Sequence, residues 1–180
     1  GPRESCQHLF AIRIVPEDVD LIRQFDVCHT SCYSNIEYEL PALAAACKVS
    51  FDFSDKRDPE YLKRVCPHLT YAFFSGADLT LADCRALLEQ ACGLGTKIAG
   101  VTRGKEGALF YDGSDFCSQG IKPANAVDTM GAGDSFIAGF LTRYEDTGKM
   151  GEALDYAAER AALSCGVRGG FGHPHPMNEN

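Results

Sequence analysis

The sequence predicts an α/β protein with a mostly parallel β-sheet and helices on both faces. Short apolar segments of strand type alternate with segments of helical periodicity along most of the chain. Strands that are joined through a helix normally run parallel, because the crossover is right-handed and packs the helix on the sheet. No linker or change of composition divides the 180 residues, so we expect one domain over residues 1–180.

Helices and strands alternate in the first third of the chain. Pro16 and the two acidic residues after it suit the first turn of a helix. Pro41 lies inside a second stretch of helical spacing and predicts a break or a late start of that helix. In chain order, the predicted elements are helix 16–25, strand 26–31, helix 35–47, strand 48–53 and helix 59–65.

The alternation continues beyond residue 68 and ends on two helices. Thr80, with Asp83 three residues later, has the pattern of a capping box, and Gly93 is expected to end the same helix. Asp112-Gly113 is a strong turn signal between two apolar runs and predicts a hairpin. In chain order, the predicted elements are strand 69–75, helix 80–93, strand 97–102, hairpin 107–119, a short β-like segment at 125–127 and helices at about 133–144 and 151–165.

Composition argues against several classes of function. The net charge of −8, with scattered basic residues, argues against binding to nucleic acid or to an anionic membrane surface. The longest apolar run, residues 41–47, is too short to span a bilayer. Nine cysteines without a CxxC pair indicate reduced thiols, so we expect a cytoplasmic protein. Because the chain begins at Gly1 without an initiator Met, we expect it to be processed or to be part of a longer protein.

The segment VDTMGAGDSF, residues 127–136, places glycines and carboxylates at the predicted start of a helix. A helix N-terminus carries unpaired N–H groups and a partial positive charge. Gly131, Ala132 and Gly133 would let an anion approach these groups without meeting a bulky side chain. Asp134 could then accept a proton from a hydroxyl group that attacks a bound phosphoryl group. A tight turn in which Asp134 only caps the helix is the alternative interpretation.

Two other phosphate-binding motifs are excluded. The sequence has no GxxxxGK[ST] pattern, so it lacks a P-loop. The GxGxxG pattern fails because Phe136 stands where the third glycine is required. In α/β sheets, ligands bind beyond the carboxyl ends of the strands, so the loops that lead into helix N-termini there are the candidate sites.

Three segments resemble the ribokinase-like (phosphofructokinase-B type) carbohydrate kinases. DTMGAGDSF, residues 128–136, is similar to the family's C-terminal signature D-T-x-G-A-G-D-x-F. VTRGKEGALFY, residues 101–111, resembles the nucleotide segment T-x-G-x-x-G, and FDFSDKRDPEYL, residues 51–62, resembles a strand-end segment. The resemblance covers residues 26–170 and corresponds to the C-terminal part of such an enzyme. It implies a ribokinase-like three-layer α/β/α fold, with the N-terminal part and the lid outside these residues.

The resemblance also implies an activity. Within the family, FDFSDK and DTMGAGDSFIAGFL are most similar to fructoselysine 6-kinases. This implies an ATP-dependent transfer of the γ-phosphoryl group of MgATP to a hydroxymethyl group of a small sugar or Amadori compound. Ribose, fructose and nucleosides are acceptors of related kinases and stay open as alternatives. A non-catalytic nucleotide-binding module, either a pseudokinase or an inactive fragment, is the other alternative. The whole protein is expected to form a homodimer.

Roles of single residues follow from the resemblance alone. Asp134 matches the catalytic base and, with Asp52, is expected to contact the substrate. Gly131, Ala132 and Gly133 match the anion hole for the transferred group. The residues expected to bind the nucleotide are Thr102, Arg103, Gly104, Lys105, Glu106, Gly107 and Gly133. For metals, Asp78 is expected to act on Mg²⁺ indirectly, and Asp128 and Thr129 to support a monovalent cation such as K⁺ near a C-terminal loop at residues 164–172.

The sequence departs from the family pattern at several positions. Ser75 and Asp78 stand where the family carries Asn and Glu, which organise phosphate and Mg²⁺. Ser54 replaces an Asn in the strand-end segment, and Ala157 or Ala158 stands near an Asn that is usual in the last helix. The carboxylate of Asp78 keeps an outer-shell role toward Mg²⁺ open.

Overall fold

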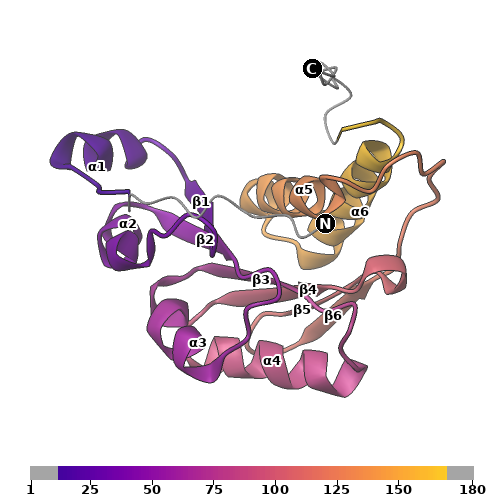
Figure 1. The fold of residues 1–180 in the computed structure, drawn as a ribbon, viewed down its shortest axis with the longest axis horizontal. Helices are drawn as coiled ribbons and strands as arrows, with labels where there is room; N and C mark the ends of the chain where they lie inside the picture. Colours follow the sequence, from indigo (N-terminus) through magenta and orange to yellow (C-terminus); the bar gives the residue numbers. More distant parts are fainter. Residues whose placement is uncertain (1–11, 170–180) are drawn as a thin grey trace, which may run out of the picture.

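A computed structural model describes residues 12–169, which form a six-stranded β-sheet with helices on both faces (Figure 1). The strands follow one another in chain order. Strands β1 to β4 are parallel, β5 is antiparallel to β4, and β6 is antiparallel to β5. The predicted α/β class with a mostly parallel sheet is therefore confirmed. The strands are β1 Val27–Ser31, β2 Lys48–Asp52, β3 Tyr71–Ser75, β4 Ile98–Thr102, β5 Ala108–Tyr111 and β6 Phe116–Gln119.

Two apolar cores lie on opposite faces of the sheet, one under α2, α3 and α4 and the other under α5 and α6. Strand β3 supplies both, because Ala72 and Phe74 point into the first core and Tyr71 and Phe73 into the second. Burial of each aromatic ring contributes about 1.5–3 kcal/mol. The helices are α1 Pro16–Ile22, α2 Leu40–Ala46, α3 Pro59–Val65, α4 Leu81–Gly93, α5 Ala132–Thr147 and α6 Met150–Cys165.

The first two helices are shorter than predicted. Helix α1 ends at Ile22, and Phe25, which was predicted to belong to it, is 61% exposed beyond its end. Helix α2 shows the late start that Pro41 predicts: residues Glu37–Glu39 form a 3₁₀ turn, and the α-helix begins at Leu40. A proline lacks the N–H group that donates a hydrogen bond inside a helix. In the first turn this N–H group has no acceptor within the helix, so proline is tolerated there.

Helix α4 begins as predicted and ends differently. The amide of Asp83 donates to Thr80 Oγ1 at 3.1 Å, and the amide of Thr80 donates to Asp83 Oδ2 at 3.3 Å. Gly93, the predicted cap, is instead the last helical residue, and Gly95 has the positive φ of +119°. The turn at Gly95 favours glycine for two reasons: its φ is positive, and a Cβ there would lie only 3.3 Å from the Cα of Pro67.

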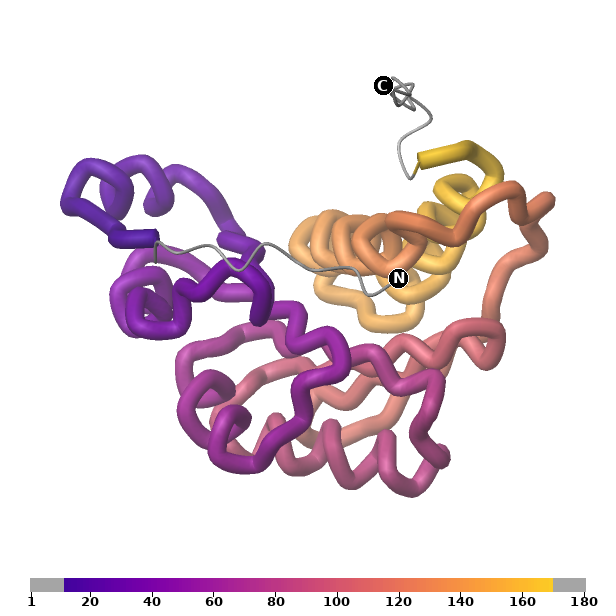
Figure 2. Tube along the Cα trace, viewed as in Figure 1, coloured from indigo at the N-terminus to yellow at the C-terminus, as the bar shows by residue number. Residues whose placement is uncertain are grey.

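The long connection from β6 to α5 leaves the sheet and returns over the second face, as the trace in Figure 2 shows. The predicted β-like segment at 125–127 is wrong, since this stretch forms no strand. The amides of Val127 and Asp128 instead donate to the Cys165 carbonyl, at 2.8 and 3.1 Å. These bonds fix the start of α5 against the end of α6. Among the helices that the structure describes, none is long and apolar enough to cross a membrane.

Candidate active site

The first turn of α5 presents free backbone amides. Gly131 is the N-cap residue and has a φ of +76°, which glycine adopts at no steric cost. The Ala132 amide donates to the Thr129 carbonyl at 3.3 Å and is therefore already used. In the described part of the chain, the amides of Gly131, Gly133 and Asp134 have no acceptor. Three N–H groups at a helix N-terminus are thus available to an anion.

Gly133 and Asp134 are both exposed in this turn. A Cβ added at Gly133 would meet no heavy atom within 4 Å, so packing inside the chain does not require glycine here. The carboxylate of Asp134 makes no hydrogen bond or ion pair with any residue between 12 and 169. It therefore makes no capping hydrogen bond to its own helix. Its role as a base and the role of the glycines stay predictions.

A cavity of about 580 Å³ lies beside this turn, and we call it the hairpin cavity because it reaches the start of the β5–β6 hairpin. Its wall includes the turn at α5, the loop after β4, the connection after β6 and one face of α6. Predicted nucleotide-binding residues that line it are Thr102, Gly104, Lys105, Gly107 and Gly133.

The loop after β4 is shaped by two glycines with positive φ. Gly107 has a φ of +84°, and a Cβ there would lie 2.0 Å from the Gln119 carbonyl oxygen, so only glycine fits. Gly104 has a φ of +57° and opens the 3₁₀ turn Gly104–Glu106. Arg103 and Glu106 form an ion pair with each other and do not line the hairpin cavity. These two predicted nucleotide contacts are therefore not brought to the cavity.

A groove of about 910 Å³ lies on the other side of the same turn, between α5 and β1, and we call it the β1 groove. Asp134 lines the β1 groove, whereas Gly133 lines the hairpin cavity. Two consecutive residues thus face two different hollows. A free amide and an unpaired carboxylate between two ligand-sized spaces suit the transfer of a group from one bound molecule to another.

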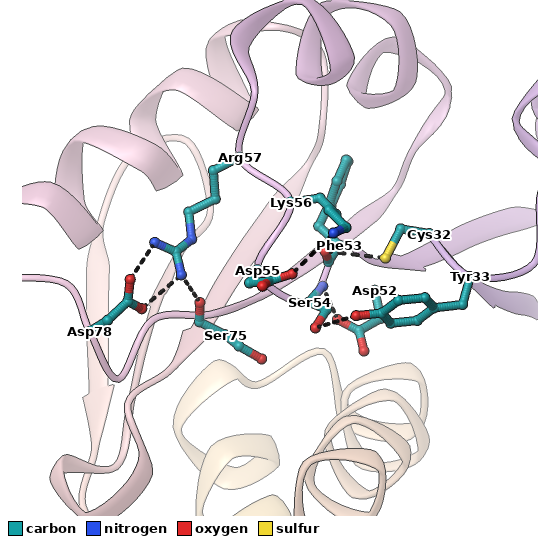
Figure 3. A network of polar contacts seen from close by, with 10 residues as sticks. All are labelled: Cys32, Tyr33, Asp52, Phe53, Ser54, Asp55, Lys56, Arg57, Ser75 and Asp78. Atoms are coloured by element: carbon teal, nitrogen blue, oxygen red, sulfur yellow. Dashed lines mark hydrogen bonds and ion pairs between the residues drawn. The ribbon is translucent and has the colours of Figure 1, made fainter. Parts of the chain in front are cut away.

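Asp52 lies at the end of β2 and is half-buried. Its Oδ1 accepts a hydrogen bond from the Ser54 amide at 2.8 Å, and Tyr33 donates to Ser54 Oγ at 3.3 Å (Figure 3). Burial raises the pKa of Asp52, the Ser54 amide and His29 oppose that rise, and the charge of Asp134 adds to it. Asp52 and Asp134 are therefore close enough to influence each other, although they lie far apart in the sequence.

The Asp78 carboxylate is not free, because it forms an ion pair with Arg57 (Figure 3). Arg57 Nη2 donates to Asp78 Oδ1 at 2.7 Å and to the Ser75 carbonyl at 2.8 Å, while Nη1 donates to Asp78 Oδ2 at 3.0 Å. This bidentate pair lowers the pKa of Asp78. Both carboxylate oxygens already have a donor, so this side chain would have to leave Arg57 before it could act on Mg²⁺.

Asp128 is also occupied by the chain itself. Its Oδ1 accepts the Met130 amide at 3.0 Å and its Oδ2 accepts the Gly169 amide at 3.1 Å, which lowers its pKa. Thr129 lines the hairpin cavity. Between residues 12 and 169, no cluster of three or more His, Cys, Asp or Glu side chains could hold a metal ion. The metal roles predicted for Asp78, Asp128 and Thr129 stay predictions, and positions 170–172 of the predicted C-terminal loop lie outside the described residues.

Sequence reasoning missed much of the hairpin cavity wall. The missed residues belong to the connection after β6 and to the small side chains on α6 other than Ala158, which the sequence analysis names. Ala158, Ala161, Ala162 and Cys165 recur at helical spacing, so a stripe of small residues was the signal that could have revealed this face. The residues missed from the connection include Gly120, Ile121, Lys122, Ala124 and Ala126.

Known proteins with similar sequences cover most of this chain. It is 49% identical over 160 residues to the fructosamine kinase FrlD of Bacillus subtilis (strain 168), a match that covers 89% of this chain and 56% of that protein. It is 38% identical over 159 residues to the fructoselysine 6-kinase of Escherichia coli (strain K12), covering 86% of this chain and 59% of that protein. The chain therefore spans somewhat more than half the length of these relatives.

Solved structures share the fold. The microbiome-derived acarbose kinase Mak1 superposes with a TM-score of 0.74 at 29% identity and covers 87% of this chain and 54% of its own. The Arabidopsis thaliana ribokinase complexed with ribose and ATP also gives a TM-score of 0.74, at 21% identity, over 87% of this chain and 55% of its own. These superpositions confirm the predicted ribokinase-like arrangement of sheet and helices.

The match to a family model rests on a large part of the chain. The model described as pfkB family carbohydrate kinase matches residues 42–174, which include the loop after β4, the connection after β6 and the first turn of α5. Together with the identity to two sugar kinases, this match settles the relationship that the signature at residues 128–136 predicted. The chain belongs to the pfkB family of carbohydrate kinases.

Proposed function

We propose that the protein containing this chain transfers the γ-phosphoryl group of ATP to a hydroxymethyl group of a sugar. One observation carries the proposal: the first turn of α5 separates two hollows, with Gly133 on the hairpin cavity and Asp134 on the β1 groove. Reactants held on the two sides of such a turn can meet in line across it. ATP is assigned to the hairpin cavity because the glycine loop that resembles a nucleotide segment lines it.

Asp134 has the chemistry for the acceptor side. Its unpaired, exposed carboxylate can take the proton of the sugar hydroxyl as that oxygen attacks the phosphorus atom. The free amides of Gly131 and Gly133 can donate hydrogen bonds to the oxygens of the transferred group, where negative charge is greatest. The aligned dipoles of α5, a helix of 16 residues, favour the same anion at its N-terminus.

The acceptor proposed first is fructoselysine or a related Amadori compound, phosphorylated at the 6-position. Support comes from the names of two relatives, a fructosamine kinase and a fructoselysine 6-kinase. Mg²⁺ is proposed to enter as the ATP complex and to neutralise phosphate charge. K⁺ activation, a homodimer and a cytoplasmic location are proposals that rest on the family resemblance and composition.

A non-catalytic nucleotide-binding module is the second candidate. The engagement of Asp78 by Arg57 favours it, because a carboxylate predicted to act on Mg²⁺ is neutralised inside the chain. Release of ADP by the full-length protein, measured in a coupled assay over Amadori compounds, fructose, ribose and nucleosides, separates the two. We expect turnover that depends on one acceptor class. Binding of ATP without ADP release for any acceptor would establish the module.

A further inference from the structure

His29 on β1 has no role in the site as described so far. It is exposed and lines the β1 groove together with Asp134, so its ring faces the space assigned to the acceptor. The residues around it on the groove wall include apolar Val27 and Ile137. The ring of His29 offers a hydrogen bond that these two apolar side chains cannot supply.

The imidazole of His29 is fixed from behind. Strands β1 and β2 are parallel, and His29 stands opposite Ser50 in their register. His29 Nδ1 and Ser50 Oγ are 2.9 Å apart, and Ser50 is fully buried. In the described residues, Nε2 has no partner, whichever atom of the pair carries the proton. The free nitrogen is a donor in one tautomer and an acceptor in the other, and a sugar hydroxyl can match either.

The charges near His29 connect it to the proposed chemistry. Partial burial lowers the pKa of His29, and Asp52 and Asp134 oppose this shift to a smaller extent. The ring is therefore mainly neutral at neutral pH, and the two carboxylates that influence its pKa are those expected to contact the substrate. A neutral ring adds hydrogen bonding without forming a permanent ion pair that would withdraw Asp134 from its role as a base.

We propose that His29 is a substrate-binding residue whose Nε2 bonds a hydroxyl group of the acceptor across the β1 groove from Asp134, while Ser50 holds the ring. This inference rests on the proposed function and adds a residue that the family signature does not contain. It also assigns the end of the β1 groove nearest the first turn of α5 to a polyhydroxylated ligand.

The test uses the full-length protein and measures binding of fructoselysine and of ATP by calorimetry, beside steady-state kinetics. His29→Leu keeps the bulk of the ring and removes its nitrogens. We expect the dissociation constant of the sugar to rise by about 3- to 10-fold, with that of ATP unchanged, because one hydrogen bond is lost. His29→Gln places an amide near Nε2, so it should recover most of the affinity. Ser50→Ala should weaken sugar binding by about 2-fold, since the ring is then less well fixed.

His68→Gln is the matched control, because His68 is half-buried at the end of a 3₁₀ turn and lines neither hollow. Sugar affinity within 2-fold of wild type in His29→Leu, as in the control, would overturn the inference and leave His29 as a partner of the buried Ser50 hydroxyl. If His29→Leu fails to fold, the Ser50→Ala result decides. A wild-type protein that binds neither fructoselysine nor another sugar contradicts the proposed function itself, and the role of His29 falls with it.

Discussion

The two hollows beside the first turn of α5 differ in how their walls are built. The hairpin cavity is lined mainly by backbone and small side chains from the loop after β4, the connection after β6 and α6. The β1 groove is larger, at about 910 against 580 Å³, and carries acidic side chains and a histidine. Small residues suit a flat ligand held by shape and backbone amides, whereas polar side chains suit a ligand with many hydroxyl groups. The first turn of α5 can therefore contact two chemically different ligands, one in each hollow.

Asp134→Asn is expected to have the largest effect. An amide cannot accept the proton from the acceptor hydroxyl, so kcat in the full-length protein should fall by about 10²–10⁴, with ATP binding nearly unchanged. The measurements are steady-state ADP release and calorimetric titration of ATP. Asp146→Asn is a matched control, because Asp146 lines the same groove and, among residues 12–169, pairs only with Arg143. Equal turnover in both variants would mean that the β1 groove is not the acceptor side.

Gly133→Ala tests the boundary between the two hollows. The added Cβ meets nothing within the chain, so the variant should fold with unchanged or slightly higher stability, by up to about 1 kcal/mol. The added methyl group would occupy the place proposed for the phosphoryl group. We therefore expect kcat to fall by about 10- to 100-fold, an effect no larger than the loss of one oxyanion donor. Thermal unfolding and ADP release are measured together. Gly151→Ala, in the first turn of α6 and equally unhindered, is the control.

A pair of identical substitutions distinguishes the hollows directly. Ala162 lines the hairpin cavity and Ala138 lines the β1 groove. Ala162→Leu should raise the KM for ATP by about 10-fold and leave that for the sugar unchanged, because the larger side chain displaces part of one ligand. Ala138→Leu should do the reverse. A common change in both KM values for either variant would show that the assignment of ligands to the two hollows is wrong.

The sequence predicted the features that depend on local signals. The order of strands and helices follows from alternating periodicity, and the start of α5 follows from the glycines and acids at residues 128–134. Thr80 and Asp83 fixed a helix start in the same local way. The end of the same helix was predicted less well, because Gly93 was predicted to be its cap, whereas the glycine with positive φ is Gly95, which lies against Pro67. That contact joins distant parts of the chain, and no local pattern contains it.

The walls of the candidate site could be predicted only in part. Asp134 and the glycines were found because their spacing is a motif, whereas His29 and its partner Ser50 meet only through strand register. The ion pair of Arg57 and Asp78 likewise depends on two loops that follow different strands. Pairings of this kind are set by tertiary packing, so they become visible only when the fold is known.

The Cys165 carbonyl accepts amides from Val127 and Asp128, and Asp128 in turn accepts the Gly169 amide. These bonds join the residues just before α5 to the residues at and just after the end of α6. A displacement of the C-terminal end of α6 would therefore reach the first turn of α5 through these hydrogen bonds, without passing through the sheet.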